Sequence, residues 1–96
     1  MIRHVCMFTL KDEGREANLR EFCERAQALR GIDGVRSFAV VRNAQGTPAS
    51  NYDVALVMDF DNVADLDAYQ KSPVHVAFGE FVYTVRVDRA CIDYEV

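Results

Sequence analysis

The chain has 96 residues, of which half are apolar and 27% are charged. This length fits a single domain spanning residues 1–96 and excludes a multi-domain enzyme, while the apolar content excludes a disordered chain. The net charge of -4 argues against nucleic acid as a general partner. No apolar run is long enough to cross a membrane and no signal-peptide pattern is present, so we expect a cytoplasmic protein.

The chain is expected to begin with a strand over residues 2–10, because IRHVCMFTL is rich in β-formers and a charged segment follows it. Apolar residues at three- and four-residue spacing then predict an amphipathic helix over residues 17–29. Two further strands are predicted over residues 35–42 and 52–60, joined as a hairpin by the polar loop NAQGTPASN.

The second half of the chain carries two helix-start signals. Asp61 or Asn62 can cap a short helix, and Ser72 followed by Pro73 marks a fresh start, which predicts a kinked or broken helix pair. The last run, residues 85–96, alternates well enough to be a closing strand.

The predicted order of strand, helix, strand, strand, helix, strand is typical of an α+β, ferredoxin-like βαββαβ fold. Its four-stranded antiparallel sheet carries both helices on one face. The two-residue period of strands places apolar side chains on both faces of the sheet. The second face, with Val5, Met7, Ala55 and Val57, therefore needs its own cover. A homodimer packed sheet against sheet is the simplest prediction.

The three cysteines, Cys6, Cys23 and Cys91, are widely spaced and form no CxxC motif. Neither a disulfide framework nor a structural zinc site is predicted, and we expect reduced, buried thiols. A metal site built from His4, His75, Cys6 and Cys91 would lack any local ligand spacing. With no nucleotide or flavin motif either, we expect no metal and no cofactor.

His4 and His75 are the only histidines, and histidine moves protons near neutral pH without much tuning. His4 shares a strand face with Cys6 and Phe8; if that face looks toward the helices, His75 and Tyr69 can converge on it. A tyrosine hydroxyl can hold a carbonyl oxygen while a histidine takes a proton. The competing interpretation is that these side chains are satisfied members of the core, which is the commoner case.

The last strand places Arg89, Cys91 and Asp93 on one face. Charges on a core-facing side must be paired or must serve a ligand. Arg89 and Asp93 either pair with each other or lie in solvent, or else Arg89 receives an acidic ligand. Cys91 and Cys6 are expected to act as small apolar fillers on neighbouring strands.

Four segments, IRHVCMFTLKD, NYDVALVMDF, AYQKSPVHVAF and RACIDYEV, together resemble the stress-responsive α/β barrel (Dabb) family over nearly the whole chain. The most specific pieces are His4 in a hydrophobic first strand, the block from Tyr69 to His75 with Pro73 inside it, and the terminal pair Asp93-Tyr94. This resemblance implies a ferredoxin-like subunit that dimerises through its sheet into a barrel.

One plant branch of that family, the olivetolic acid cyclase type, closes a linear polyketide by an aldol step without cofactor or metal. The resemblance implies that His75 and Tyr69 are catalytic and that His4 lines the pocket. The sequence departs from that branch at Cys23 and Ala26, where larger rings would be expected, and at Arg89. A roomier, more polar pocket does not suit the same alkyl substrate.

We therefore expect a pocket between sheet and helices for a small organic acid or carbonyl compound, with cyclase, lyase or isomerase chemistry. A non-catalytic stress-response dimer and a cofactor-free monooxygenase of the same architecture are the alternatives. An enclosed cavity touching His4, Tyr69 and His75 would favour a small-molecule protein over a structural dimer. The residues expected to bind substrate are His4, Cys6, Phe8, Phe22, Leu56, Arg89, Cys91 and Asp93.

Overall fold

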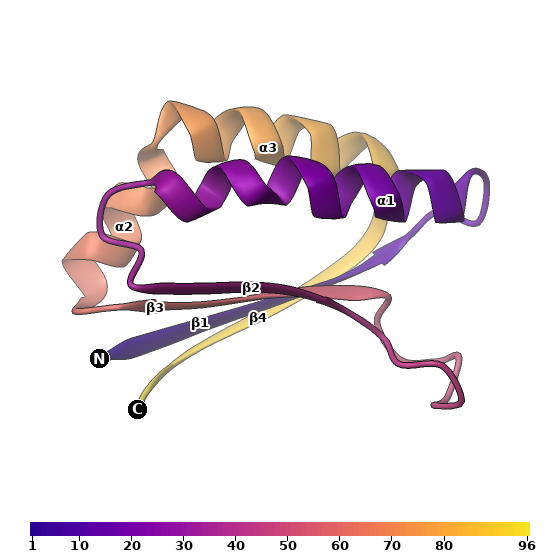
Figure 1. Ribbon diagram of the computed structural model, residues 1–96, viewed down its shortest axis with the longest axis horizontal. Coiled ribbons are helices and arrows are strands. Elements are labelled where there is room, and N and C mark those ends of the chain that lie inside the picture. The colour runs from indigo at the N-terminus through magenta and orange to yellow at the C-terminus, as the bar shows by residue number, and fades with distance from the viewer.

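Four antiparallel strands form one sheet with the order β2-β3-β1-β4 in the computed structural model, which describes residues 1–96 (Figure 1). All the helices lie on one side of this sheet, and its other side is bare. The elements in chain order are β1 (Ile2–Leu10), α1 (Arg15–Ala26), the 3-10 turn η1 (Gln27–Gly31), β2 (Ser37–Arg42), β3 (Val54–Phe60), α2 (Val63–Lys71), α3 (Pro73–Val85) and β4 (Arg86–Glu95).

The ferredoxin-like fold and its element order are as predicted. The first helix begins two residues earlier than predicted, and its expected last turn is the separate 3-10 turn η1. Asn62 caps α2 by accepting a hydrogen bond from the backbone N–H of Asp65 at 2.9 Å. Ser72 caps α3 in the same way, and Pro73 occupies its first turn, where a missing N–H costs nothing. The predicted break between the two helices is therefore confirmed.

The core lies between the helices and one face of the sheet. Strand β1 sits between β3 and β4, and every second side chain of β1 and β3 is buried against the helices. On the helix side of the core, α1 contributes Leu19 and Phe22, while α2 and α3 contribute Leu66 and Phe78. The ring of Phe22 packs against Phe8 at 5.3 Å and against Phe78 at 5.1 Å between ring centroids.

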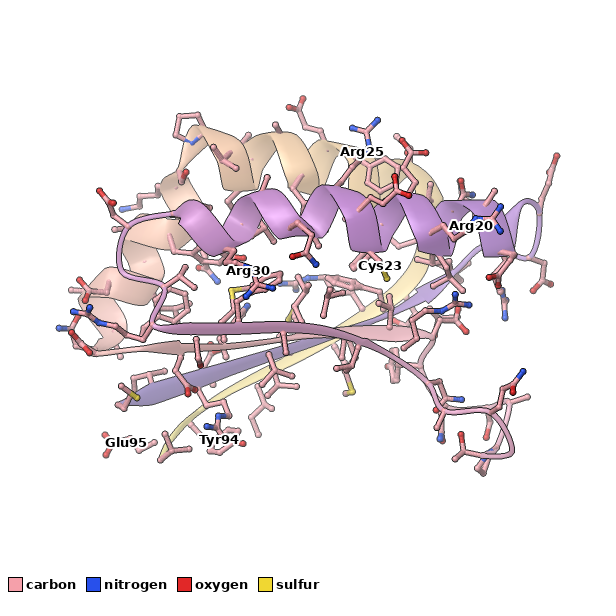
Figure 2. All side chains as sticks on the ribbon, in the orientation of Figure 1. Arg20, Cys23, Arg25, Arg30, Tyr94 and Glu95 are labelled. Atoms are coloured by element: carbon pink, nitrogen blue, oxygen red, sulfur yellow. A yellow bond between two sulfur atoms is a disulfide. The ribbon has the colours of Figure 1, made fainter.

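The opposite face of the sheet carries no helix, and apolar side chains cross it from edge to edge. Val5 and Val57 face each other in its middle, and Met7 is paired with Ala55. Figure 2 shows Tyr94 on this side, away from the helices. The apolar members of this outer face are Val5, Met7, Ala39, Val41, Ala55, Val57, Ala90, Ile92 and Tyr94.

No helix of this chain has the length and apolar character needed to span a membrane.

Phe22 is fully buried in the core, so its replacement tests the packing between α1 and α3. We expect Phe22→Ala to lower the free energy of unfolding by about 3 to 5 kcal/mol, because it removes ring contacts and leaves a cavity. Urea unfolding at one fixed protein concentration measures this change. The control is Arg20→Ala on the exposed face of α1, for which we expect a change within about 0.5 kcal/mol. A loss below about 1 kcal/mol for Phe22→Ala would contradict this packing.

Candidate functional site

A cavity of about 180 Å³ lies between the helix-facing side of β1 and β4 and the helices α2 and α3. Its size corresponds to about six water molecules, which suits a small ligand. Hollows elsewhere on the surface are larger but more open, and none is lined by histidine or cysteine. The cavity is lined by His4, Cys6, Phe8, Leu56, Tyr69, Gln70, His75, Phe78, Gly79, Val82, Tyr83, Arg86 and Arg89.

His4 is positioned by the pairing of the first and last strands. It lies opposite Asp93 in the β1–β4 register, and its Nδ1 is 2.5 Å from Oδ1 of that carboxylate. The side chain of His4 is buried, whereas that of Asp93 is 43% exposed. A carboxylate that accepts the Nδ1 proton leaves the lone pair of the imidazole on Nε2. The structure thus orients the His4 ring and fixes its tautomer.

Tyr69 lies close to both imidazoles. Its ring centroid lies 6.2 Å from that of His4 and 4.7 Å from that of His75. The Tyr69 side chain is fully buried near the C-terminus of α2, and burial raises the pKa of its hydroxyl well above the ordinary value. The phenol therefore stays protonated and can donate a hydrogen bond throughout the neutral range.

His75 lies in the first turn of α3 and is half-buried. Its Nδ1 is enclosed without a hydrogen-bond partner. Burial lowers the pKa of His75; the carbonyl of Gln70 opposes this shift, whereas the charge of Arg89 adds to it. A neutral imidazole at pH 7 is the form that can accept a proton.

The open end of the cavity is cationic. Arg86 and Arg89 line it, and the guanidinium of Arg86 lies 5.5 Å from the centre of the Tyr83 ring. No aspartate or glutamate is among the lining residues, although the whole chain has a net charge of -4. Such a local excess of positive charge favours an anionic ligand, and a guanidinium matches the geometry of a carboxylate.

Two cysteines lie in the floor of the site. Cys6 and Cys91 are directly opposite each other in β1 and β4, with their Cα atoms 4.2 Å apart, and their sulfur atoms are joined as a disulfide. The expectation of reduced thiols was wrong for this pair, because the strand register joins residues that are 85 positions apart. Cys23 remains a free, half-buried thiol on α1.

The structure brings together most of the residues that the sequence predicts to be catalytic or to bind a substrate. His75, Tyr69, His4, Cys6, Phe8, Leu56 and Arg89 all line the cavity.

Three residues that were predicted to bind a substrate do not line the cavity. Phe22 does not line the cavity because its ring is fully buried in the core. Cys91 is joined to Cys6 below the cavity, and Asp93 contacts His4. The suggested pairing of Asp93 with Arg89 is replaced by the pairing with His4, since residues four apart on a strand are about 13 Å apart.

The sequence reasoning missed the part of the lining that comes from α3 and the start of β4. Phe78, Val82, Tyr83 and Arg86 line the cavity and are not among the residues predicted to bind a substrate. A helical spacing of His75, Phe78, Gly79 and Val82 would have placed them on one face of α3. Arg86 is the first residue of β4, beyond that helical pattern.

Solved structures of the same fold cover nearly the whole chain. A dimeric protein with a ferredoxin-like fold from Bacteroides fragilis is 32% identical, with a TM-score of 0.86, and the match covers 99% of this chain and 95% of that one. A Dabb family protein from Mesorhizobium loti is 31% identical, with a TM-score of 0.82 and the same coverage.

A hydroxynitrile lyase from Passiflora edulis shares the fold alone, at 14% identity and a TM-score of 0.85, over 99% of this chain and 92% of that one. No curated protein matches the chain. The family model for the stress responsive A/B barrel domain matches residues 2–96. Together with the ferredoxin-like fold and the 31% identical relative, this match shows that the chain belongs to the Dabb family.

Proposed function

We propose that this protein performs acid–base chemistry on a small organic acid that carries an enolisable carbonyl group, as a cyclase, lyase or isomerase. The observation that carries the proposal is the convergence of Tyr69 and both histidines on one cavity with a cationic mouth. Three elements supply these groups, β1, α2 and α3, so that their meeting depends on the tertiary fold.

His75 acts as the general base in this proposal. It is neutral at pH 7 because burial lowers its pKa, and it takes a proton from the carbon next to the substrate carbonyl. The electron pair of that C–H bond moves to the carbonyl oxygen as an enolate forms. A positioned base of this kind contributes on the order of 10²- to 10⁴-fold to the rate.

Tyr69 stabilises the charge that develops on the carbonyl oxygen. Its protonated hydroxyl donates a hydrogen bond inside a site that is shielded from water, where such a bond is stronger than in solution. His4, held by Asp93, supplies a second oriented group near the Tyr69 ring. The carboxylate of the substrate binds Arg89 and Arg86 at the mouth.

The alternative is a non-catalytic dimer in which the same side chains serve only the core. Close packing around Tyr69 and the histidines would support it, whereas a cavity touches all three. The unpartnered Nδ1 of His75 also favours a ligand-binding site. A satisfied core histidine would have a hydrogen-bond partner at this position.

We also propose that the protein is a homodimer joined through the outer face of the sheet. The apolar side chains of that face cross all four strands, and Val41 and Ile92 are 47% and 59% exposed. Exposed apolar patches of this extent mark interfaces. The relative from Bacteroides fragilis is described as dimeric, which supports the same assembly here.

The catalytic proposal predicts that the protein accelerates exchange of carbon-bound protons. Small aromatic and aliphatic oxo acids are incubated in D₂O, and loss of the proton next to the carbonyl is followed by NMR. We expect His75→Gln to slow exchange by on the order of 10²- to 10⁴-fold and Tyr69→Phe by on the order of 10²- to 10³-fold. The matched control is Tyr94→Phe on the outer face. This variant should catalyse proton exchange in the substrate at the parent rate. Exchange that persists in His75→Gln would contradict the assignment of the base.

A second prediction concerns the pH dependence of stability. The unfolded chain binds a proton at His75 near its ordinary pKa of about 6.5, and the folded chain binds it only at lower pH. Below about pH 6.5 the unfolded state therefore holds more protons, and the free energy of unfolding falls as the pH drops toward the folded pKa. Between about pH 7.5 and about pH 5.5, the free energy of unfolding measured in urea should fall less for His75→Gln than for the parent. An NMR titration midpoint for His75 at or above 6.5 would be inconsistent with this burial.

The dimer is tested by placing a charge in the middle of the outer face. We expect Val57→Asp to convert the dimer to a monomer in light scattering at micromolar concentration, because an unpaired buried charge at an interface is costly. Val76→Asp on α3 replaces a half-exposed valine on the helix side and should leave the dimer intact. A parent protein that is monomeric at this concentration would refute the assembly.

A further inference from the structure

We propose that the reduced protein binds a zinc-class divalent ion through Cys6, Cys91 and His4, and that the Cys6–Cys91 disulfide is the metal-free, oxidised form of this site. The proposal shares His4 with the catalytic one but can be tested separately, since it concerns metal binding and needs no substrate. Three facts support it: the closeness of the ligand atoms, the carboxylate behind the histidine and the exposure of one cysteine.

The ligand atoms are close enough to share an ion. Sγ of both cysteines and a ring nitrogen of His4 lie within 4.8 Å of one another. In a tetrahedral zinc site the Zn–S bonds are about 2.3 Å and the Zn–N bonds about 2.0 to 2.1 Å, which places two thiolates about 3.8 Å apart. Once the disulfide is reduced, the two side chains are free to rotate about their Cα–Cβ bonds, which would open this distance.

The environment of His4 matches that of a metal-binding histidine. Its Nδ1 is bonded to Asp93 at 2.5 Å, so the lone pair available to a metal is on Nε2. Histidines that ligate metals almost always donate their other N–H group to a carboxylate or a carbonyl, which orients the ring and increases its basicity. Asp93 would hold the ring in this way.

The site is accessible from one side only. Cys6 and His4 are buried, whereas Cys91 lies on the edge strand β4 and is exposed. A reductant can therefore reach the disulfide at Cys91, and a metal ion can enter by the same side. Thiolate and imidazole together select zinc-class ions over magnesium or calcium, which prefer oxygen ligands.

Both steps balance chemically. A dithiol reductant breaks the S–S bond, is itself oxidised to a disulfide, and leaves Cys6 and Cys91 as two thiols. Binding of Zn²⁺ then forms two Zn–S bonds and one Zn–N bond and releases the two thiol protons to solvent. Three protein ligands would leave the fourth position of a tetrahedral ion open, and two of these ligands, Cys6 and His4, line the cavity.

The experiment uses Co²⁺ as a spectroscopic probe for the zinc site. The protein is reduced, freed of reductant under argon and titrated with Co²⁺. We expect one equivalent to produce thiolate-to-cobalt absorption together with the visible bands of a tetrahedral ion, and Zn²⁺ to displace it. The oxidised protein should give neither signal, and reduction should restore both. Failure of the reduced parent to develop thiolate-to-cobalt absorption would overturn the proposal.

Variants separate this site from the third cysteine. Cys91→Ser, on the exposed edge strand, should weaken Co²⁺ binding by at least about 100-fold, and Asp93→Asn by about 10- to 100-fold. Cys23→Ser is the matched control and should bind as the parent does, because Cys23 lies on α1 outside the cluster. Full binding by Cys91→Ser would refute the ligand assignment.

A second measurement does not depend on the folding of any variant. In the reduced parent, bound Zn²⁺ should protect Cys6 and Cys91, but not Cys23, from alkylation, as read by mass spectrometry. Equal labelling of all three cysteines with and without Zn²⁺ would overturn the proposal. Failure of the proton-exchange assay would leave both of these readouts unaffected, so the two proposals are tested separately.

Discussion

The antiparallel register between β1 and β4 decides which side chains of the candidate site become neighbours. It pairs the first strand with the last, so residues almost a whole chain apart become neighbours. His4 lies opposite Asp93 and Cys6 lies opposite Cys91 in successive positions on the same face. A shift of β4 by one residue would turn Cys91 and Asp93 to the other face of the sheet, away from Cys6 and His4. The orientation of the His4 ring and the contact between the two sulfur atoms therefore depend on one set of backbone hydrogen bonds.

The presence of apolar side chains on both faces of the sheet explains how such a short chain can contain a cavity and still fold. A domain of this size buries only about 60 to 70% of its unfolded surface, which leaves little apolar packing to spare. A cavity beside His75 and Tyr69 makes the core on the helix side thinner still. A dimer through Val5, Val57 and their neighbours would offset this loss, because it removes a second apolar surface from water.

Much of the architecture could be predicted from local sequence signals. The β-rich run before Lys11 ends where β1 ends, and the Ser72-Pro73 pair marks the start of α3. The alternation of β1 also placed His4 on the side of Tyr69 and His75. Contacts across strands could not be predicted in this way, since no local pattern encodes which residue of β4 lies opposite Cys6 or His4.

The helices cover the sheet unevenly, and this unevenness creates the site. Every helix-facing side chain of β3 is buried, whereas Arg89, Cys91 and Asp93 on the same face of β4 are exposed. The helix-facing side of the edge strand β4 is therefore exposed to water, whereas the same side of β1 is covered by the helices. Groups at this boundary combine a buried partner with an exposed one, as the pairs His4–Asp93 and Cys6–Cys91 do. The inner member of each pair is shielded from water, while the outer member stays within reach of solvent, reductant and ligand.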